Sequence, residues 1–489
     1  MKRHMHWIDG RETPPEAGEY LPTLDPMTTE PWAEIARGTA ADIDSAVNAA
    51  QQAFAAWRRT GPSRRAEVIW RLCDLIAEHA DELAALESRD AGKVIREVRG
   101  QQVMLREWYH YFATLAHHGE GRQIPVDNTS ITAMTVREPY GVIAVVPAFN
   151  SPMMLGAMGL VPALAAGNTV VVKPPEVNSL SLLLLGKLAQ QAGLPDGCLN
   201  VVSGFGHEAG DALVGHPLVR KVFFTGGPES ARAVAGRAAN GLKPTLLELG
   251  GKSANIFFPD VDVDAVANGV IAGIFAAAGQ TCVAGSRLLV HESIADELVK
   301  TVTARAGRIR LGNPRDVATE MGPMSQEKIL NGVVRRVTEA IDAGAQLTLG
   351  GPGAPLPDRG WFYPPTVLDR VTNDMAVAQN ELFGPVLSVI RFRDEDEAVA
   401  IANDSPFGLA AGVWTNDFGR AHRVVRELEA GTVWVNTYRA LNYAIPFGGT
   451  KESGYGRENG IDGFAEFTQP KSIWFESSGA AVADPFVLR

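Results

Sequence analysis

Short apolar runs alternate with longer helical patterns through the first half of the chain. The runs GVIAVV at 141–146 and TVVVK at 169–173 are apolar at almost every position, which is typical of strands whose sheet is covered on both faces. Strands separated by helical patterns of this length predict βαβ units and a parallel sheet, so the fold class is α/β. Further strands are expected at 199–203, 221–225 and 245–249, with helices around 179–192, 206–215 and 229–239.

Before these strands, apolar positions follow the helical period. Asp42 and Ser63 are the expected N-caps of two helices, because their side chains accept hydrogen bonds from free backbone N–H groups. The buried faces are expected to consist of Ile43, Ala46, Val47, Ala50, Phe54 and Trp57 in the first helix and of Val68, Leu72, Leu75 and Ile76 in the second.

The second half repeats this alternation and predicts a second α/β domain. Helices are expected near 262–277 and 293–307, and a helix begins near Asp394 or Glu395. The Gly/Pro-rich stretch 350–360 is expected to be a surface loop. Strand patterns occur in SRLLVHE, WFYPPTVL, ELFGPVLSVIRF, AAGVWT and GTVWVN.

Two alternating segments within 121–139 predict a hairpin outside either core, and the C-terminal segment SIWFES has the character of a strand able to pair with it.

The stretch between Glu138 and Lys173 holds no charged residue and is long enough to span a bilayer. Four prolines interrupt it, and a membrane helix broken so often would leave backbone groups unpaired in lipid. The stretch is therefore interpreted as a buried strand–helix–strand core, and no membrane partner is expected.

Composition narrows the classes of function. The 489 residues exceed the size of a single core, and the net charge of −11 provides no attraction for nucleic acid or an anionic membrane. Three cysteines without a CxxC pair fit neither a disulfide framework nor a zinc site, which favours a cytoplasmic protein without a metal. His4 and His6 are expected in a frayed tail rather than in a metal site. A small molecule is the expected partner.

Three residues are candidates for chemistry at an activated carbonyl. Cys282 lies in AAAGQTCVAGS, where a helix pattern ends and a strand begins, so a reactive thiol there would be both held and reached. Glu248 ends the strand of LLELGGKS, where burial would raise its pKa toward that of a general base. Asn150 follows a buried strand, and its amide would donate to an oxyanion. The structural alternatives are an inert buried thiol, a strand-end carboxylate that binds backbone N–H groups, and a turn asparagine.

Two further segments suggest a nucleotide. Lys173 and Glu176, in VVVKPPE, offer a donor and an acceptor to the hydroxyls of a ribose, although a lysine often ends a strand merely to reach solvent. In FFTGGPES a strand, a Gly-Gly turn and a helix start follow one another, so that a phosphate could approach free N–H groups. The common GxGxxG signal is absent, and GxGxxxG at 204–210 is weak evidence.

Taken together, these segments resemble the aldehyde dehydrogenase family. PAFNSP, KPPE, FTGG, LELGGKS, GQTC, ELFGPV and PFGGTKESGYGRENG occur in the family's order along nearly the whole chain, and Glu248 and Cys282 have the family's usual separation. The resemblance implies a Rossmann-like NAD-binding domain at 1–118 and 140–249 and a catalytic domain at 250–466. It also implies an oligomerisation arm at 119–139 and 467–489, and a homo-oligomer, with a tetramer favoured over a dimer.

The resemblance also implies roles for individual residues. Cys282 is the implied nucleophile, and Asn150 and the Cys282 N–H are implied to form the oxyanion hole. Glu248 is the implied base for the deacylating water. Glu458 resembles a second acid in the proton path. Lys173 belongs to both the catalytic and the cofactor set. The other implied cofactor contacts are Glu176, Phe224, Thr225, Gly226, Gly227, Glu248, Leu249, Gly250, Glu381 and Phe383. The implied substrate lining consists of Met154, Leu155, Met158, Val283, Arg439, Leu441, Tyr443 and Phe447.

The chain departs from the family's pattern at two places. Pro147 stands one position earlier than the family's proline, although Asn150 stays in register, and Gly227 and Ala231 replace the usual serine and glycine of the cofactor helix. The missing hydroxyl changes the expected contact with the pyrophosphate but not the use of NAD, which is expected in preference to NADP.

The implied reaction is the NAD-dependent oxidation of an aldehyde to the acid through a thioester on Cys282. Two alternatives remain. One is a CoA-acylating semialdehyde dehydrogenase, and the presence of Glu248 argues against it. The other is a catalytically silent family member, and the intact set of Cys282, Glu248 and Asn150 argues against that. Arg439, in NTYRALN, is expected either to pair with a carboxylate at the far end of a semialdehyde or to be an ordinary surface arginine.

Overall fold

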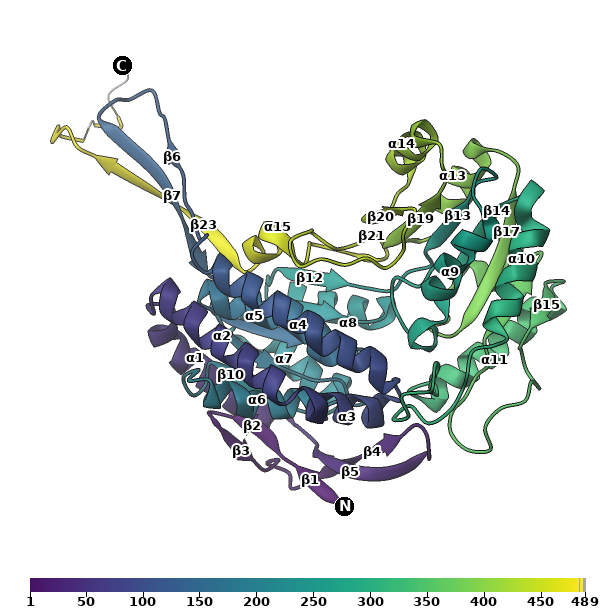
Figure 1. Ribbon diagram of the computed structural model, residues 1–489. Helices are drawn as coiled ribbons and strands as arrows, with labels where there is room; N and C mark the ends of the chain where they lie inside the picture. Colours follow the sequence, from purple (N-terminus) through teal and green to yellow (C-terminus); the bar gives the residue numbers. More distant parts are fainter. Residues whose placement is uncertain (483, 487–489) are drawn as a thin grey trace.

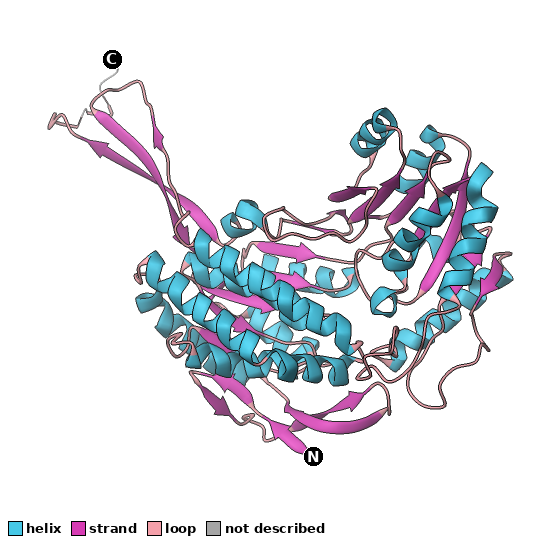
Figure 2. Ribbon diagram, in the orientation of Figure 1, coloured by secondary structure: helices cyan, strands magenta, loops and turns pink. Residues whose placement is uncertain are grey.

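A computed structural model describes residues 1–482 and 484–486, and it contains two large sheets with helices around them (Figures 1 and 2). The first sheet has eight strands, and its central five run parallel. In spatial order the strands are β22 (Gly454–Tyr455), β12 (Thr245–Glu248), β11 (Val219–Thr225), β8 (Val142–Val146), β9 (Thr169–Val172), β10 (Leu199–Val201), β2 (His6–Ile8) and β3 (Arg11–Thr13).

Helices cover both faces of the first sheet. Successive residues of a strand point to opposite faces, so Val142 and Ala144 of β8 join one apolar core while Ile143 and Val145 join the other. The first of these cores includes residues of α1 (Ala40–Trp57), α7 (Asp211–Gly215) and α8 (Pro228–Ala239). The second includes residues of α2 (Pro62–Glu78), α3 (Ala80–Ala91), α4 (Ile95–Leu115), α5 (Pro152–Ala166) and α6 (Leu180–Gln191).

The charge-free stretch forms β8, α5 and β9, which confirms the predicted buried core. Among residues 1–482 and 484–486, no helix is both long and apolar enough to cross a membrane. The predicted helix at 206–215 is a π-helical turn at 206–210 followed by α7.

Both predicted N-caps were wrong by a few residues. The first helix begins at Ala40 after Thr39, and the carboxylate of Asp42 accepts hydrogen bonds from the Thr39 N–H and hydroxyl at 2.8 Å. Asp42 therefore stabilises the helix start from the third helical position, as the acidic partner of a capping box. The second helix begins at Pro62 rather than after Ser63, because proline needs no N–H partner in the first turn.

The N-terminus is ordered, contrary to the expected frayed tail. β1 (Lys2–His4) pairs with β5 (Glu30–Ala36), which in turn pairs with β4 (Tyr20–Asp25) in a three-stranded sheet. The His6 side chain in β2 is fully buried, and burial lowers its pKa to about 4. Strand pairing with β10 holds this segment, and local sequence carries no signal for such a distant partner.

The second sheet confirms the predicted second α/β unit. Its seven strands are parallel except at one edge and follow the order β15 (Gln346–Leu349), β16 (Thr366–Asp369), β17 (Val386–Phe392), β14 (Arg287–His291), β13 (Ala254–Phe257), β19 (Ala410–Trp414) and β20 (Thr432–Val435). The associated helices are α9 (Val263–Ile274), α10 (Glu292–Ala306), α11 (Glu327–Asp342), α12 (Ala376–Gln379), α13 (Glu395–Asn403) and α14 (Phe418–Glu427).

Several elements of this half differ from the prediction. β13 and α11 were not predicted, and the helix expected at 262–277 ends at Ile274, followed by a short 3₁₀ turn at 276–279. The predicted start of α13 is confirmed, because Asp394 caps it by accepting from the Glu397 N–H at 2.9 Å. The stretch 350–360 is a loop, as expected.

A three-stranded arm extends away from both sheets (Figure 1). β7 (Ile131–Pro139) pairs with β6 (Gln123–Ile124) and, along its whole length, with β23 (Thr468–Glu476). The predicted hairpin and its pairing with the C-terminal strand are confirmed. The remaining elements are β18 (Phe407–Gly408), β21 (Thr450–Lys451) and α15 (Gly460–Ala465).

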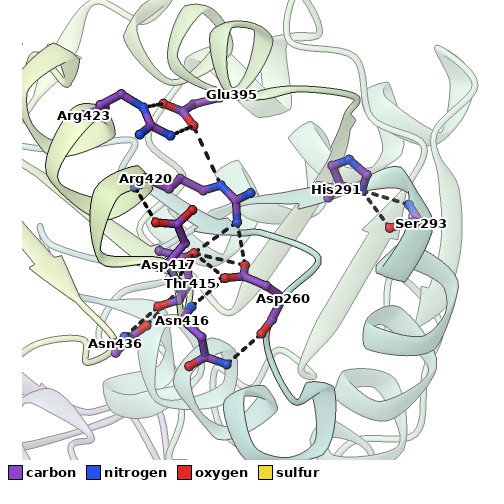
Figure 3. A network of polar contacts seen from close by, with 10 residues as sticks. All are labelled: Asp260, His291, Ser293, Glu395, Thr415, Asn416, Asp417, Arg420, Arg423 and Asn436. Carbon is purple, nitrogen blue, oxygen red and sulfur yellow. Dashed lines mark hydrogen bonds and ion pairs between the residues drawn. The ribbon is translucent and has the colours of Figure 1, made fainter.

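A polar network ties together the loops at the carboxyl ends of β13, β19 and β20 (Figure 3). The Asp260 carboxylate accepts from the Thr415 hydroxyl, the Asn416 and Asp417 N–H groups and the Arg420 guanidinium, at 2.8–3.0 Å. Asn436 accepts from the Thr415 N–H at 3.0 Å. This network fixes the edge of the second sheet.

Candidate active site

A cavity of about 890 Å³ opens at the carboxyl ends of the parallel strands in the first sheet. The segments after β8, β9 and β11 and the end of β12 line it, together with residues from the second sheet's side. From β8 the chain crosses over to β9, its neighbour on one side. The neighbour of β8 on the other side is β11, which comes later in the sequence, so the direction of the strand order reverses at β8. A sheet of this kind binds ligands in the crevice at such a reversal.

Cys282 reaches this cavity from the segment between the 3₁₀ turn and β14, and its side chain is half-buried. Exclusion of water, and then the nearby carboxylates of Glu248, Glu381 and Glu458, raise the pKa of the thiol. The thiol is therefore protonated at rest, and a nucleophilic attack by its sulfur requires a neighbouring group that accepts the proton.

Asn150 also lines the cavity, from the segment after β8. Its Nδ2 donates to the Gln280 carbonyl at 3.1 Å, two residues before Cys282. One N–H of the amide thereby fixes the side chain beside the nucleophile's loop, and the second N–H stays free of that bond. This geometry suits a donor to an oxyanion at the carbon that Cys282 would attack.

Glu248 ends β12 and lines the same cavity. Burial raises its pKa to about 8, although the Arg457 guanidinium and the Gly449 N–H act in the opposite direction. Its Oε1 is buried and has no hydrogen-bond partner among the described residues. A buried carboxylate with a free oxygen and a pKa near neutrality is suited to take a proton.

Glu458 lies outside the residues that line the cavity but close to Glu248. Burial, and then the charge of Glu248, raise its pKa well above the usual range. Two carboxylates so placed do not both ionise readily, so the pair holds a proton.

Lys173 and Glu176 stand together at the end of β9, with 3.4 Å between Nζ and Oε1. Both line the cavity, and Glu176 Oε1 also accepts from the Gly206 N–H at 2.6 Å. Lys173 is almost fully buried, and burial lowers its pKa. The pair therefore presents a rigid donor and acceptor to a ligand.

The remaining predicted cofactor residues also line the cavity. They are Phe224, Thr225, Gly226, Gly227, Leu249, Gly250, Glu381 and Phe383. Gly227 precedes α8, and apart from its two chain neighbours no residue has an atom within 4 Å of the position that a Cβ would take there. Glu381 accepts from the Gly251 N–H at 3.2 Å, and burial raises its pKa to about 7. Phe383 has a left-handed φ of 55° and contacts the Phe149 ring edge-on at 5.5 Å.

The predicted substrate residues are less closely gathered. Leu155 lines the cavity. Val283 and Phe447 share an apolar cluster with Cys282, and Leu441 packs against both this cluster and the one that contains Met154 and Met158. Tyr443 packs against the latter cluster and lines a separate shallow depression beside α4, while Arg439 is half-buried and donates to the Ala272 carbonyl at 3.2 Å.

Sequence reasoning missed other residues of the cavity wall. Phe149, Arg237 and Lys328 line it but belong to patterns that look like ordinary loop and helix surface. Across residues 1–482 and 484–486, no cluster of three histidine, cysteine or acidic side chains could hold a metal ion.

Comparison with known proteins identifies the chain. The model of the aldehyde dehydrogenase family matches residues 13–473. The chain belongs to the aldehyde dehydrogenase family. Among its relatives, a (Z)-2-((N-methylformamido)methylene)-5-hydroxybutyrolactone dehydrogenase of Acinetobacter baylyi is 44% identical over the full length of both chains. The NADP/NAD-dependent aldehyde dehydrogenase PuuC of Escherichia coli is 42% identical over 96% of this chain and 94% of its own length.

Solved structures agree with this assignment. PnpE from Pseudomonas sp. WBC-3 superimposes with a TM-score of 0.96 at 39% identity, covering 99% of this chain and 100% of its own. Betaine aldehyde dehydrogenase from Staphylococcus aureus in complex with NAD⁺ gives a TM-score of 0.96 at 34% identity, covering 99% and 97%. The predicted α/β aldehyde dehydrogenase fold is confirmed, and the chain is an enzyme that oxidises aldehydes with NAD.

Proposed function

We propose that this aldehyde dehydrogenase forms its acyl intermediate on Cys282, with Asn150 as oxyanion donor and Glu248 as general base. The observation that carries the proposal is the meeting of these three side chains in one cavity although they come from three distant segments of the chain. The thiol, the amide donor and the buried carboxylate are the three groups that acyl transfer through a thioester requires.

The cavity suits NAD on the side of the first sheet. Lys173 and Glu176 would hold the adenosine ribose, the start of α8 at Gly226 and Gly227 would face the pyrophosphate, and Glu381 would hold the nicotinamide ribose. The volume of about 890 Å³ and the open space at Gly227 support this fit. Bound NAD supplies the acceptor for the hydride, and the protein positions the substrate carbon against it.

The reaction begins with attack by the Cys282 sulfur on the aldehyde carbon, while the thiol proton passes to Glu248. The electron pair of the carbonyl moves to oxygen, and Asn150 Nδ2–H and the Cys282 N–H donate to that oxygen. Re-formation of the carbonyl expels the hydride and leaves a thioester on Cys282. After Glu248 loses its proton, by way of Glu458, it deprotonates a water that adds to the thioester. The carbon–sulfur bond then breaks, the departing sulfur takes the proton from Glu248, and the acid is released.

We further propose the division into an NAD-binding part (1–118 and 140–249), a catalytic part (250–466) and an arm (119–139 and 467–489) that joins subunits of a homotetramer. The composition of the two sheets and the separate arm support this division. Free thiols at Cys73, Cys198 and Cys282 support a cytoplasmic location.

Replacement of the two central residues tests the two halves of the reaction. Cys282→Ala should abolish NADH formation. Glu248→Gln should slow the burst of about one NADH per site, because the thiol lacks its proton acceptor, and should slow the turnover that follows still more, because hydrolysis lacks its base. Stopped-flow absorbance at the NADH band measures both. Steady-state turnover of Glu248→Gln at the wild-type rate would contradict the role of Glu248, and NADH formation by Cys282→Ala that of the thiol.

The dependence on pH provides an internal control. Glu248 must be ionised to accept a proton, and its pKa is raised to about 8, so hydrolysis in the wild type should accelerate as the pH rises through about 8. The slow phase of Glu248→Gln should lack this rise. Addition of coenzyme A should not change the product, which separates hydrolysis from transfer to a thiol.

A further inference from the structure

A buried charged corner lies behind the two loops that carry Asn150 and Cys282. It lies within residues 87–97, at the turn from α3 to α4, where Glu87, Asp90 and Lys93 are buried and Glu97 is half-buried. Lys93 is 7% exposed, and burial lowers its pKa although Glu87 and Glu97 act in the opposite direction. Burying ionisable groups such as Glu87 and Lys93 is costly, so an arrangement that keeps them needs a physical role.

Lys93 is joined to the Asn150 loop by a short chain of hydrogen bonds. Its Nζ donates to Ser151 Oγ at 2.7 Å and to Gln101 Oε1 at 2.6 Å, and Ser151 Oγ donates to the Asn150 carbonyl at 2.6 Å. Glu87 Oε1 accepts from the Met153 N–H at 3.1 Å, in the first turn of α5. The corner therefore fixes both the backbone of Asn150 and the helix that follows it.

Glu97 is joined to the loop of the nucleophile. Its Oε1 accepts from the Ala277 N–H at 3.0 Å, five residues before Cys282. Ala277 and Ala278 both have left-handed backbone angles, with φ of 54° and 53°. Consecutive non-glycine residues in this region are strained and persist only where surrounding contacts hold them, and they concentrate at functional sites.

The two attachments meet at the active site. Asn150 Nδ2 donates to the Gln280 carbonyl, between Ala277 and Cys282. The path from Lys93 through Ser151 and Asn150 thus reaches the loop before Cys282 at Gln280. Glu97 binds the same loop at Ala277. Each bond in this closed path fixes the distance between the amide of Asn150 and the sulfur of Cys282.

We propose that Lys93 and Glu97 are positioning residues that hold the Asn150 loop and the Cys282 loop in the register needed for the oxyanion hole. The inference rests on the proposed roles of Asn150 and Cys282. Neither positioning residue lines the cavity, so neither touches substrate or cofactor there. Their effect is on the attack by the sulfur and on the later attack by water, because in both steps the carbonyl oxygen gains charge and the amide donor must meet the new oxyanion.

The first test measures the NADH burst in Lys93→Met and Glu97→Ala. The burst rate should fall by about 10²-fold, as expected for a misplaced oxyanion donor. The Kd for NAD should stay within threefold of wild type. The rate at which iodoacetamide alkylates Cys282 should also stay within threefold, because alkylation needs no oxyanion hole. Glu97→Gln keeps the acceptor for the Ala277 N–H and should recover the burst. Arg99→Ala, at an exposed arginine of the same helix that pairs with Asp81, is the matched control.

The second test is a double-mutant cycle, which stays decisive if Lys93→Met lowers stability. Ser151→Ala interrupts the path, while Lys93 keeps its bond to Gln101 Oε1. The loss of burst rate in Ser151→Ala should nearly vanish in the background of Asn150→Ala, since both changes act on one donor. Any of three results would overturn the proposal. The first is that the losses of burst rate multiply in the double variant. The others are a burst rate within threefold of wild type in both Lys93→Met and Glu97→Ala, or a parallel fall in NAD binding and alkylation. The Cys282→Ala control separates this failure from a failure of the proposed mechanism.

Discussion

Burial is the common cause of the unusual proton affinities at single residues of this site. It raises the pKa of Glu248 to about 8 and that of Glu381 to about 7, and it raises the pKa of the Cys282 thiol as well. A fully solvated glutamate would be too weak a base for either proton transfer. The same apolar surroundings that stabilise the fold thus prepare the acid–base chemistry of the cavity.

The carboxylate of Glu176 should select NAD over NADP. It is 40% exposed at the cavity wall and would face a 2′-phosphate on the adenosine ribose, where like charges repel. The wild-type enzyme should prefer NAD by at least ~10-fold in kcat/KM, and Glu176→Gln should reduce that preference by about 10-fold. Steady-state kinetics with both cofactors measure this, and equal values of kcat/KM in the wild type would contradict it.

Arg439 is proposed to bind a carboxylate at the far end of the substrate. Among the described residues it forms no ion pair, yet its charge contributes to lowering the pKa of Lys93, so it stands near the Asn150 loop. Arg439→Ala should lower kcat/KM about 10-fold for a semialdehyde with a distal carboxylate but not for its uncharged analogue. Arg439→Lys, which keeps the charge, should lose less. An unchanged ratio between the two substrates in Arg439→Ala would mean that this arginine serves only the loop.

At the scale of elements, strand ends are held by side chains from distant loops. Asp260 follows β13, and its carboxylate joins the segment between β19 and α14 (Figure 3). Burial opposes the charge of Asp260, but hydrogen bonds from Thr415 and the backbone outweigh it and lower its pKa. The carboxylate is therefore held ionised at the edge of the second sheet.

Removal of this carboxylate should destabilise the second sheet without changing the chemistry. Asp260→Ala leaves several N–H and O–H donors without a partner, which should cost about 2 kcal/mol and lower the apparent Tm by roughly 5 °C. Differential scanning fluorimetry measures the shift, and the NADH burst should remain. Asp264→Ala, at an exposed carboxylate, is the control. Equal Tm values for the two variants would contradict a structural role for the network.

At the scale of the molecule, the arm needs a partner surface. β7 and β23 pair over nine residues, and Trp474 and Phe475 of β23 are more than half exposed. Large exposed aromatic side chains on an extended sheet indicate an interface. This geometry supports assembly through the arm.

The proposed assembly makes a prediction about size in solution. The wild type should be a tetramer by multi-angle light scattering at low micromolar concentration, and Trp474→Glu should shift it to smaller species, because the interface would bury an unpaired charge. Val103→Glu, at an exposed position of α4, should leave the size unchanged. A monomeric wild type would refute the assembly.

Much of the molecule followed from the sequence by itself. Apolar runs and helical periods are local, so they determine β8, α5, β9 and the order of the elements. The carboxyl ends of parallel strands share one edge, so Asn150, Lys173 and Glu248 were predictable neighbours once the strands were assigned. Resemblance to the family then identified Cys282 as their partner.

Only the tertiary structure decided which residues support them. His6 is buried because β2 pairs with β10, nearly two hundred residues away. Lys93 precedes α4 and Glu97 lies in its first turn, and packing places both behind Asn150 and Cys282. Burial and contact depend on which distant segments meet, whereas local patterns record only which way a single element faces.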